Sequence, residues 1–381
     1  MNSSRKKQKL RTGFTTGAAA AAAAKGALLF LVDGTAPESV WISFIGGGGR
    51  EIPIHSRRMV DGRAVCTVIK DAGDDPDITH RAEIGVSLKW EPAPASGIII
   101  TGGRGVGRVT KPGLEIPPGG PAINPGPQKM IRAALTEILA ERNITAPRRL
   151  EVDVFVPEGE ELSKKTLNSR LGILGGISIL GTTGLVRPMS HAAYIATIAS
   201  AMSVARACSV KRVYLTTGRR SEKHAIRLHP DEPAEAFIQI GDFFQKSLRL
   251  ASETGMDAAV LTVFYGKALK MAYGFPHTHA AKSDMCMKRL TGWVTEYSSD
   301  QRLAREVRKA NTARQAFFLL KDVCPEAIAR TGREMIRSAR KFASADMTIH
   351  ALIMDFEGCP VYDSRKDDGR AENNDRQGHP A

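Results

Sequence analysis

The stretch that decides the fold class runs from residue 192 to residue 267, where AAYIATIASAMSVARA (192–207) is followed by KRVYLTTGRR (211–220) and AAVLTVFYGK (258–267). The first segment predicts a helix, because alanine is the strongest helix former. The other two are rich in β-branched and aromatic residues and predict strands at 212–216 and 258–264, with a further helix between them at 243–254. Alternating strands and helices are typical of a parallel sheet with crossover helices, so this half of the chain is predicted to be α/β.

The chain before Pro188 has a different pattern. A helix is expected at 18–32, capped by Thr15 or Thr16, and later elements are expected in a mixed order: strands at 41–45, 51–54, 64–70, 83–90 and 98–101, a helix at 129–142 and a strand at 150–156. The sequence therefore predicts two domains, an N-terminal α+β domain over 1–188 and a C-terminal α/β domain over 189–363. The polar residues 364–381 have little to bury and are predicted to form a disordered tail.

The composition indicates an anionic partner. The 381 residues include 54 Lys and Arg against 40 Asp and Glu, a formal net charge of +14, which suits nucleic acid, anionic lipid or a polyanionic small molecule. The five cysteines show neither close pairing nor metal-ligand spacing, which favours a reducing cytoplasm. We expect no secretory signal and no membrane span, because the alanine run at 18–24 is interrupted by Lys25 and lacks a leucine-rich core.

Several segments combine glycine with hydroxyl or basic side chains and are candidate anion sites. Thr15-Thr16-Gly17 starts the first helix, Gly103–Gly107 follows a strand, and Gly181-Thr182-Thr183-Gly184 precedes Arg187. Backbone N–H groups at a helix start or in a glycine loop can approach an anion, but simple capping and a mobile surface loop are the alternatives, and both remain open. Pro112 excludes a dinucleotide fingerprint after Gly107, since that motif must open a helix.

Two clusters of ionisable side chains could carry chemistry. DAGDDPD at 71–77, with His80 nearby, could ligate a metal, act as a general base or contact a cation, although a solvated Asx-turn is the favoured alternative. His277 and His279, with Asp284, are a weak zinc signal, because no further Cys or His follows at a suitable spacing. We therefore expect a polar pocket at the histidines and no metal site.

An ordered set of motifs from about residue 11 to about residue 355 resembles the CbiD family. The motifs are RTGFTTG (11–17), DAGDDPDITH (71–80), GGRGVGRVTKPGL (102–114), PAINPGPQKMI (121–131), KKTLNSRLGILGGISILGTTGLVRPMS (164–190), EAFIQIGDF (235–243), YGKALKMAYG (265–274) and THAAKSDM (278–285). The resemblance implies transfer of a methyl group from S-adenosylmethionine to C1 of cobalt-precorrin-5B, giving cobalt-precorrin-6A in anaerobic cobalamin biosynthesis. It also implies an α+β domain joined to a Rossmann-like α/β domain.

With that reaction in view, the sequence suggests a role for each candidate residue. His279 is the first candidate for a base or polar positioner, and Asp74 and Asp77 are the second. Cofactor contacts are expected from Thr217, Gly218, Gly241 and Asp242, because ligands of parallel sheets bind where strands end and an acidic residue there can bind ribose hydroxyls. Substrate contacts are expected from hydroxyl, glycine and basic residues that suit carboxylates: Thr15, Thr16, Gly17, Lys25, Arg104, Lys111, Arg170, Thr182, Thr183 and Arg187.

Two other functions fit the charge of the chain. The first is a basic RNA-binding protein without catalytic activity, which the arm Arg5-Lys6-Lys7 would suit, although no RNP motif or stacking-aromatic cluster is present. The second is a methyltransferase for another polyanionic substrate. A corrinoid precursor carries several carboxylates on one macrocycle, so a small-molecule partner explains the net charge without nucleic acid or a membrane. A homo-oligomer is compatible with the sequence.

Overall fold

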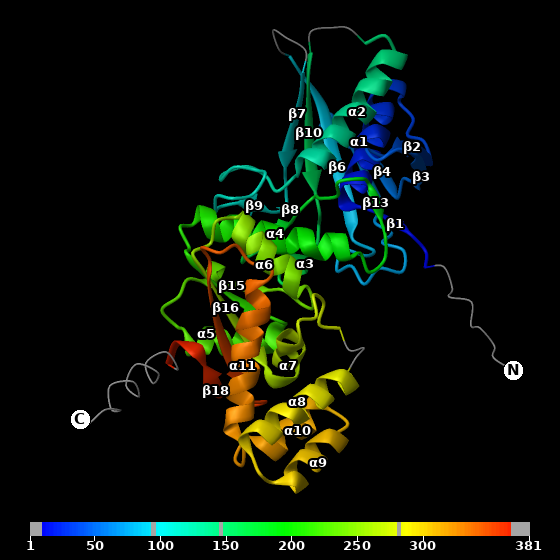
Figure 1. Ribbon diagram of the computed structural model, residues 1–381. Coiled ribbons are helices and arrows are strands. Elements are labelled where there is room, and N and C mark those ends of the chain that lie inside the picture. Colours follow the sequence, from blue (N-terminus) through cyan, green and yellow to red (C-terminus); the bar gives the residue numbers. More distant parts are fainter. Residues whose placement is uncertain (1–9, 93–96, 145–147, 280–282, 367–381) are drawn as a thin grey trace, which may run out of the picture. The chain divides into compact units, whose positions relative to one another are not determined.

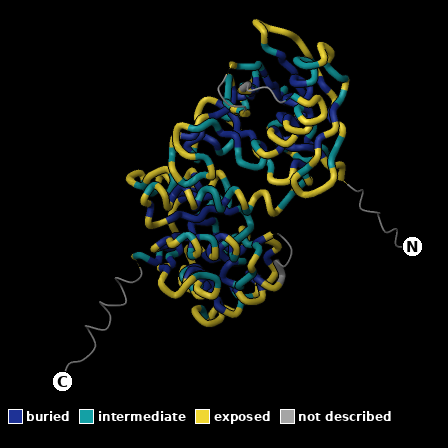
Figure 2. Tube along the Cα trace, turned by 90° about the horizontal axis from the view of Figure 1, so that it is seen from above, coloured by how far each residue is buried: buried dark blue, intermediate teal, exposed yellow. Residues whose placement is uncertain are grey.

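The computed structural model describes residues 10–92, 97–144, 148–279 and 283–366. Close approaches between Cα atoms divide the chain into two compact units, Met1–His191 and Ala192–Ala381. Each unit has its own buried core, drawn in dark blue in Figure 2, and the fold is mixed α/β. The basic arm at 5–7 lies outside the described residues.

Unit 1 is built on a five-stranded sheet in the order β4-β5-β6-β10-β7. Its strands are β4 (Ser56–Val60), β5 (Arg63–Ile69), β6 (Glu83–Pro92), β10 (Arg148–Phe155) and β7 (Gly97–Gly102). All neighbours are antiparallel except β10 and β7, which are parallel. The buried Leu150, Val152 and Val154 of β10 alternate with more exposed residues, which is the pattern of a sheet with one face on the core.

Helix α1 (Thr16–Asp33) packs on this sheet, and α2 (Pro125–Glu141) packs on α1 (Figure 1). The alanines at 18–24 are completely buried, because a side chain of one methyl group lets the helix approach its neighbours closely. Gly34 ends α1 in the left-handed conformation, with φ of 71°. In the described part of the chain, α1 alone is long and apolar enough to cross a membrane, but 72% of it is buried inside the structure, as expected of a core helix.

Short ladders close the rest of unit 1. They pair β1 (Gly13–Phe14) with β13 (Leu185–Val186), β2 (Ser39–Ser43) with β3 (Gly49–Pro53), β8 (Gly105–Val106) with β12 (Gly176–Ile177), and β9 (Arg108–Val109) with β11 (Ile173–Leu174). A short helix, α3 (Gly159–Ser163), packs near β8 and β12. Of the two alternatives left open for Gly103–Gly107, the mobile surface loop does not describe Gly105 to Gly107, which are buried and hydrogen-bonded to β12 and its neighbours. Gly105 has φ of 73°, and a Cβ there would lie 1.9 Å from the Val156 carbonyl oxygen.

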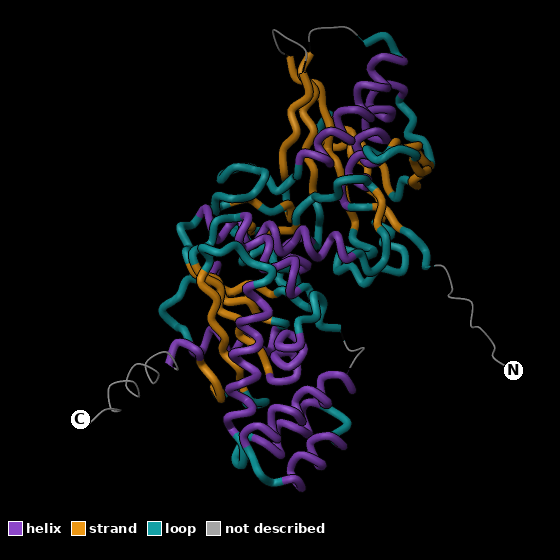
Figure 3. The backbone as a smooth tube through the Cα atoms, in the orientation of Figure 1, coloured by secondary structure: helices purple, strands orange, loops and turns teal. Residues whose placement is uncertain are grey.

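Unit 2 contains a second five-stranded sheet in the order β15-β14-β16-β17-β18. The strands are β15 (Phe237–Gln239), β14 (Arg212–Thr216), β16 (Ala258–Phe264), β17 (Thr348–Met354) and β18 (Pro360–Asp363). The first four are mutually parallel and β18 is antiparallel to β17. Figure 3 shows the strands of this unit in orange beside its helices in purple. The chain passes from β14 to β15 on one side of β14 and then crosses over to form β16 on the other side. The order in which strands are added to the sheet therefore reverses at β14, although these strands all run in the same direction.

Helices make up most of the rest of unit 2. They are α4 (His191–Ala207), α5 (Arg219–Leu228), α6 (Phe244–Glu253), α7 (Tyr265–Tyr273), α8 (Ser283–Tyr297), α9 (Gln301–Lys309), α10 (Ala313–Leu320) and α11 (Pro325–Arg340), with a 3-10 turn at Ala234–Ala236. Helices α5 and α8 are not predicted from the sequence. The segment RRSEKHAIRL of α5 contains only three apolar residues, Ala225, Ile226 and Leu228, so little in its composition marks it as part of a packed domain.

The predicted tail begins too early. Ser364 is buried, and its hydroxyl accepts a hydrogen bond of 3.0 Å from the backbone N–H of Ala351. The Arg365 guanidinium pairs with the Asp363 carboxylate at 2.7 Å. Residues 364–366 thus close the edge of the second sheet, and the remainder of the predicted tail, 367–381, lies outside the described residues.

Candidate functional site

The predicted cofactor residues of unit 2 meet where β14 and β15 end. The backbone N–H of Ile240 donates to the Thr216 carbonyl at 2.7 Å, so the two strands stay paired up to their last residues. This pairing brings Thr217-Gly218 beside Gly241-Asp242, although 24 residues separate Gly218 from Asp242 in the chain. Since the order of the strands reverses at β14, this is the edge where open parallel sheets leave a crevice for a ligand.

Asp242 is held by two side-chain donors on the same oxygen. Thr278 Oγ1 donates to Asp242 Oδ1 at 2.8 Å, and Lys267 Nζ forms an ion pair with that oxygen. The Thr278 backbone N–H also donates to the Asp242 carbonyl at 3.0 Å. Partial burial opposes ionisation of Asp242, but the hydrogen bonds from Lys267 and Thr278 outweigh it and lower the pKa of the carboxyl. The side chain is therefore an anionic acceptor at neutral pH.

The turn before Asp242 depends on glycine. Gly241 has φ of 53°, and a Cβ at this position would lie 3.1 Å from the Tyr194 ring. Tyr194 is packed on Phe243, with ring centroids 5.3 Å apart, and burial together with the charges of Asp242 and Glu222 raises the pKa of its phenol. A left-handed residue under an aromatic ring fixes the direction in which the chain enters Asp242.

Gly218 is the residue directly before helix α5, and the space beside its Cα is empty. Its backbone N–H donates to Ser221 Oγ at 3.2 Å, and no heavy atom lies within 4 Å of the place where a Cβ would be. A ligand can therefore approach this backbone closely. One turn into α5, the buried Glu222 accepts a hydrogen bond of 2.7 Å from Gln239, the last residue of β15. This contact ties the start of α5 to the edge of the sheet.

His279 is exposed at the end of the loop that carries Thr278. Lys270 Nζ donates to the carbonyls of Thr278 and His279, at 3.3 and 3.4 Å, and the ring of His279 lies 6.3 Å from that of His277. The loop is thus anchored by its backbone while the imidazole of His279 stays accessible. Within the described ranges, no three Cys, His, Asp or Glu side chains converge as a metal site. The side chain of Asp284 is not among the described ones.

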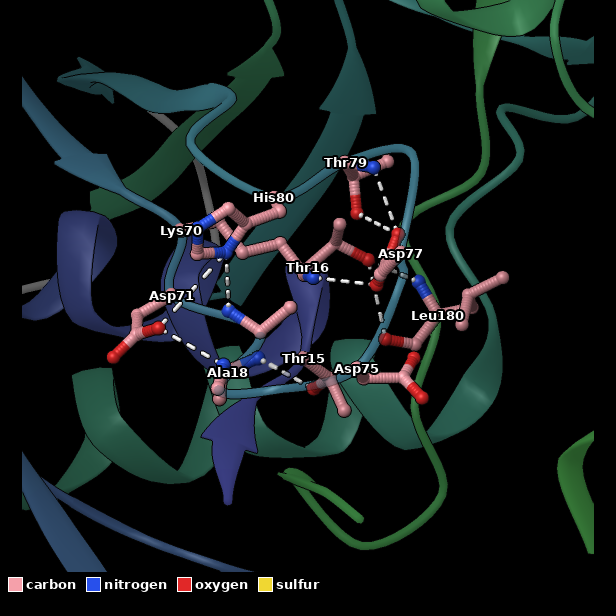
Figure 4. Close-up of polar contacts among 12 residues, drawn as sticks. Thr15, Thr16, Ala18, Lys70, Asp71, Asp75, Asp77, Thr79, His80 and Leu180 are labelled. Atoms are coloured by element: carbon pink, nitrogen blue, oxygen red, sulfur yellow. Dashed lines mark hydrogen bonds and ion pairs between the residues drawn. The ribbon is translucent and has the colours of Figure 1, made fainter. Parts of the chain in front are cut away.

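The acidic turn at 71–77 belongs to unit 1 and is saturated with internal contacts (Figure 4). Lys70 Nζ donates to Asp77 Oδ2 at 2.6 Å, and the backbone N–H and hydroxyl of Thr79 both donate to Asp77 Oδ1 at 2.7 Å. Although burial opposes ionisation, these contacts lower the pKa of Asp77. A carboxylate with a lowered pKa and two occupied oxygens is a poor base, so the predicted role of Asp77 as a base is not supported.

Other side chains of this turn accept hydrogen bonds from backbone groups, and Asp71 also forms an ion pair with the Arg11 guanidinium. Asp74 Oδ2 accepts from the Arg11 N–H at 2.6 Å, Asp75 Oδ1 accepts from the Met189 N–H at 2.8 Å, and His80 Nδ1 accepts from the Ala72 N–H at 3.1 Å. The turn thus holds Arg11 and Met189, which are far apart in the sequence, at one loop. Asp74 is exposed at this junction and remains only a prediction as a catalytic group. The favoured alternative, a structural Asx-type turn, describes the geometry best.

The start of α1 is also occupied by the chain itself. Thr15 Oγ1 caps the helix by accepting from the Ala18 N–H at 3.2 Å, while Thr16 Oγ1 accepts from the Leu180 N–H at 2.9 Å (Figure 4). The Gly17 N–H donates to the Leu180 carbonyl, and both threonines are buried. The predicted substrate contacts of Thr15, Thr16 and Gly17 therefore give way to the capping alternative. The glycine-threonine segment at 181–184 does not open a helix; it lies against this cap.

Lys25 is a structural residue too. It is buried in α1, where its Nζ lies 2.9 Å from Glu137 of α2 and donates to the Trp41 carbonyl at 3.1 Å. Its charge is neutralised between two helices and is turned away from solvent, so its contacts do not support the predicted role in substrate binding. The remaining predicted substrate residues lie in unit 1 loops: Arg104, Thr182, Thr183 and Arg187 are exposed, and Lys111 and Arg170 are partly exposed.

Lys267 and Thr278 are not among the site residues predicted from the sequence. Lys267 lies in the first turn of α7, and Thr278 lies in a loop, so neither stands out by local pattern. Their partner Asp242 is 25 and 36 residues away, respectively. The signal available in the sequence was that both occur in motifs of the resemblance, YGKALKMAYG and THAAKSDM.

Comparison with known proteins places these observations in a family. A family model described as CbiD matches residues 3–188, and a model described as the CbiD C-terminal domain matches residues 277–365. Proteins named cobalt-precorrin-5B C(1)-methyltransferase are similar over most of the chain. The protein from Geotalea daltonii is 46% identical over 80% of this chain and 86% of its own length, and that from Geobacillus kaustophilus is 39% identical over 98% and 99%.

A solved structure is also similar in sequence. The crystal structure of the cobalamin biosynthesis protein cbiD from Archaeoglobus fulgidus is 29% identical, covering 68% of this chain and 78% of that chain, with a TM-score of 0.39.

Proposed function

Since the chain belongs to the CbiD family, we propose that it methylates C1 of cobalt-precorrin-5B, giving cobalt-precorrin-6A, in anaerobic cobalamin biosynthesis. The observation that carries this proposal is the similarity to methyltransferases of that name, at 39% identity over 98% of the chain in one relative. It spans both units, so both would take part. A non-catalytic RNA-binding protein is not favoured by any of these relatives.

We propose S-adenosylmethionine as the methyl donor, bound in unit 2. Three features of unit 2 fit a nucleoside cofactor. They are the reversal of strand order at β14, the open backbone at Gly218, and the anionic side chain of Asp242 at the end of the neighbouring strand. Thr217, Gly218, Gly241 and Asp242 would contact the nucleoside. In this proposal unit 2 is a Rossmann-like domain. Residues 1–188 and 189–363 would form two functional domains.

The donor supplies a methyl group that is already activated by its positive sulfur, so the protein must mainly orient the two reactants. Holding them in near-attack geometry can supply much of the rate. His279 is exposed on an anchored loop and would position the substrate or accept a proton from it. The imidazole of His279 has two ring nitrogens that can form hydrogen bonds, whereas Asp77 is committed to Lys70.

The substrate would bind through its carboxylates to exposed side chains of unit 1. Arg104 and Arg187 can form bidentate contacts with a carboxylate, and Thr182 and Thr183 can donate single hydrogen bonds. Lys111 and Arg170 are secondary candidates. Replacing Arg187 with alanine should raise the KM for the corrinoid, most strongly at low salt, because the attraction between exposed charges is screened by ions. An unchanged KM would remove Arg187 from the binding site.

The expected partners follow from this chemistry. A small polyanionic corrinoid accounts for the positive charge of the chain, so we expect no dependence on nucleic acid or on a membrane, and a cytoplasmic location. Self-association into a homo-oligomer would be compatible with the proposed function.

The direct experiment is an anaerobic incubation of the purified protein with S-adenosylmethionine and cobalt-precorrin-5B. The expected product is heavier by one methylene unit and carries the new methyl group at C1, which mass spectrometry and NMR would show. Methylation of a different polyanion but not of this corrinoid would favour a related methyltransferase. Binding of RNA without any methyl transfer would favour the RNA-binding alternative.

A further inference from the structure

We propose that Lys267 and Thr278 are positioning residues that fix Asp242 so that its second carboxylate oxygen, Oδ2, accepts hydrogen bonds from the ribose hydroxyls of the nucleoside cofactor. This inference rests on the proposed function and deepens it. The sequence pointed to Asp242 alone; the structure adds the two side chains that determine how Asp242 is presented.

The carboxylate of Asp242 is occupied on one side only. Both side-chain donors, Lys267 Nζ and Thr278 Oγ1, point to Oδ1. Among residues 10–92, 97–144, 148–279 and 283–366, no hydrogen bond reaches Oδ2, and 25% of the Asp242 side chain is exposed. A carboxylate that is immobilised through one oxygen keeps the acceptor sites of the other for a ligand.

The position of the ion pair matches a ligand crevice. Asp242 follows β15 and Lys267 begins α7 directly after β16, and both strands flank β14. The pair therefore bridges the end of β14, next to Thr217-Gly218, at the point where the strand order reverses. Ligands of open α/β sheets bind at this reversal, with an acidic residue beside the ribose in dinucleotide sites.

The local charge favours a neutral donor at Oδ2. Lys267 already neutralises Asp242. The pKa of the neighbouring Lys270 is lowered, mainly by burial and also by the positive charge of Lys267. Two lysines beside one aspartate would repel an ammonium or sulfonium group. A pair of hydroxyls carries no charge and can donate two hydrogen bonds to a carboxylate, so the ribose is the part of the cofactor that fits.

Thr278 can act only through Asp242. It is completely buried, so it does not reach a ligand itself. Its carbonyl accepts from Lys267 at 3.2 Å and from Lys270 at 3.3 Å, while its N–H donates to the Asp242 carbonyl. The backbone of this loop is thus held independently of the hydroxyl. Removing the hydroxyl alone should free the Asp242 side chain without releasing the loop.

The test compares two ligands by calorimetry: S-adenosylhomocysteine and its 2′,3′-dideoxy analogue, which lacks both ribose hydroxyls. Wild-type protein should prefer the first by about tenfold or more, as expected for hydrogen bonds to a charged group. Thr278→Val should reduce this preference to about threefold or less by weakening the first ligand only. Thr278→Ser, which restores the hydroxyl, should restore the preference.

The acidic turn of unit 1 offers a matched control. Thr79 donates to Asp77 as Thr278 donates to Asp242, so Thr79→Val makes the same chemical change at a carboxylate outside the proposed site. It should leave the ligand preference unchanged. If Thr278→Val does not fold, Lys267→Met should show the same loss of preference, with circular dichroism as the check on folding.

Two results would overturn the inference. If wild-type protein binds S-adenosylhomocysteine and its dideoxy analogue equally, Oδ2 does not contact the ribose, although methyl transfer would still support the proposed function. If the folded Thr278→Val and Lys267→Met variants keep the full preference, these residues do not position Asp242. A failure of the wild type to bind either ligand, together with no methyl transfer, would instead overturn the proposed function and this inference with it.

Discussion

Two trios of the same residue types have different surroundings in the two units. In unit 1, Asp77 contacts Lys70 and Thr79; in unit 2, Asp242 contacts Lys267 and Thr278. Asp77 uses both carboxylate oxygens, and its lysine is 1% exposed. Asp242 uses one oxygen, and its lysine is 32% exposed.

This difference separates a structural carboxylate from one that is able to bind a ligand. A buried lysine needs its counter-ion, because an unpaired charge inside a protein is strongly destabilising. A partly exposed lysine can instead be solvated when its partner is removed. The trio in unit 1 is therefore expected to matter for folding, and the trio in unit 2 for binding.

The largest expected effect is on the stability of unit 1. Asp77→Asn should lower the free energy of unfolding by about 3 kcal/mol, because it leaves Lys70 buried without a carboxylate. Chemical denaturation monitored by circular dichroism would measure this, and the affinity for S-adenosylhomocysteine should not change in the folded protein. A stability change below about 1 kcal/mol would show that Lys70 does not depend on the pair.

Asp242→Asn should show the opposite balance. Its affinity for S-adenosylhomocysteine should fall about tenfold, which is the usual size of a lost hydrogen bond to a charged acceptor, while stability should change by less than about 1 kcal/mol. Titration calorimetry and denaturation of the same preparation would measure both. A large loss of stability with unchanged affinity would make the two trios alike.

The lowered pKa of Asp77 also predicts how the stability of the protein responds to acid. The contacts of Asp77 lower its pKa in the folded protein despite burial, so its contribution is complete above the ordinary carboxyl pKa of about 3.9 and is lost as the pH falls through the lower folded value. Denaturation curves from about pH 6 down to about pH 3 should therefore fall more steeply for the wild type than for Asp77→Asn. Parallel curves would show that Asp77 does not contribute to acid sensitivity.

The smallest effect is expected at Lys25, whose partner Glu137 is about half exposed. Lys25→Met fills the same space with an apolar side chain and leaves Glu137 free to be solvated, so stability should change by about 1 kcal/mol or less. The KM for the corrinoid should be unchanged. A raised KM would restore the substrate role that the sequence suggested and would show that a saturated ion pair can still bind a ligand.

The helices and strands with the clearest residue patterns could be predicted, because each pattern lies within the segment itself. The strands at 212–216 and 258–264 agree with β14 and β16, since a continuous apolar run with β-branched residues has few other conformations to adopt. The helix at 18–32 was found from its alanines and its threonine cap. Strand β4 was missed because it is an edge strand whose residues are mostly exposed, and so it has no apolar pattern.

The sequence by itself determined the family, the α/β character of the second half, and Asp242 as an acid at the end of a strand. These depend on motifs and on residues that are close in the chain. Only the tertiary structure showed that Lys25 and Asp77 are consumed by ion pairs and that Lys267 and Thr278 share one oxygen of Asp242. The reason is physical: whether a charged side chain is free to act depends on which partners the fold brings to it, and those partners come from distant positions in the chain.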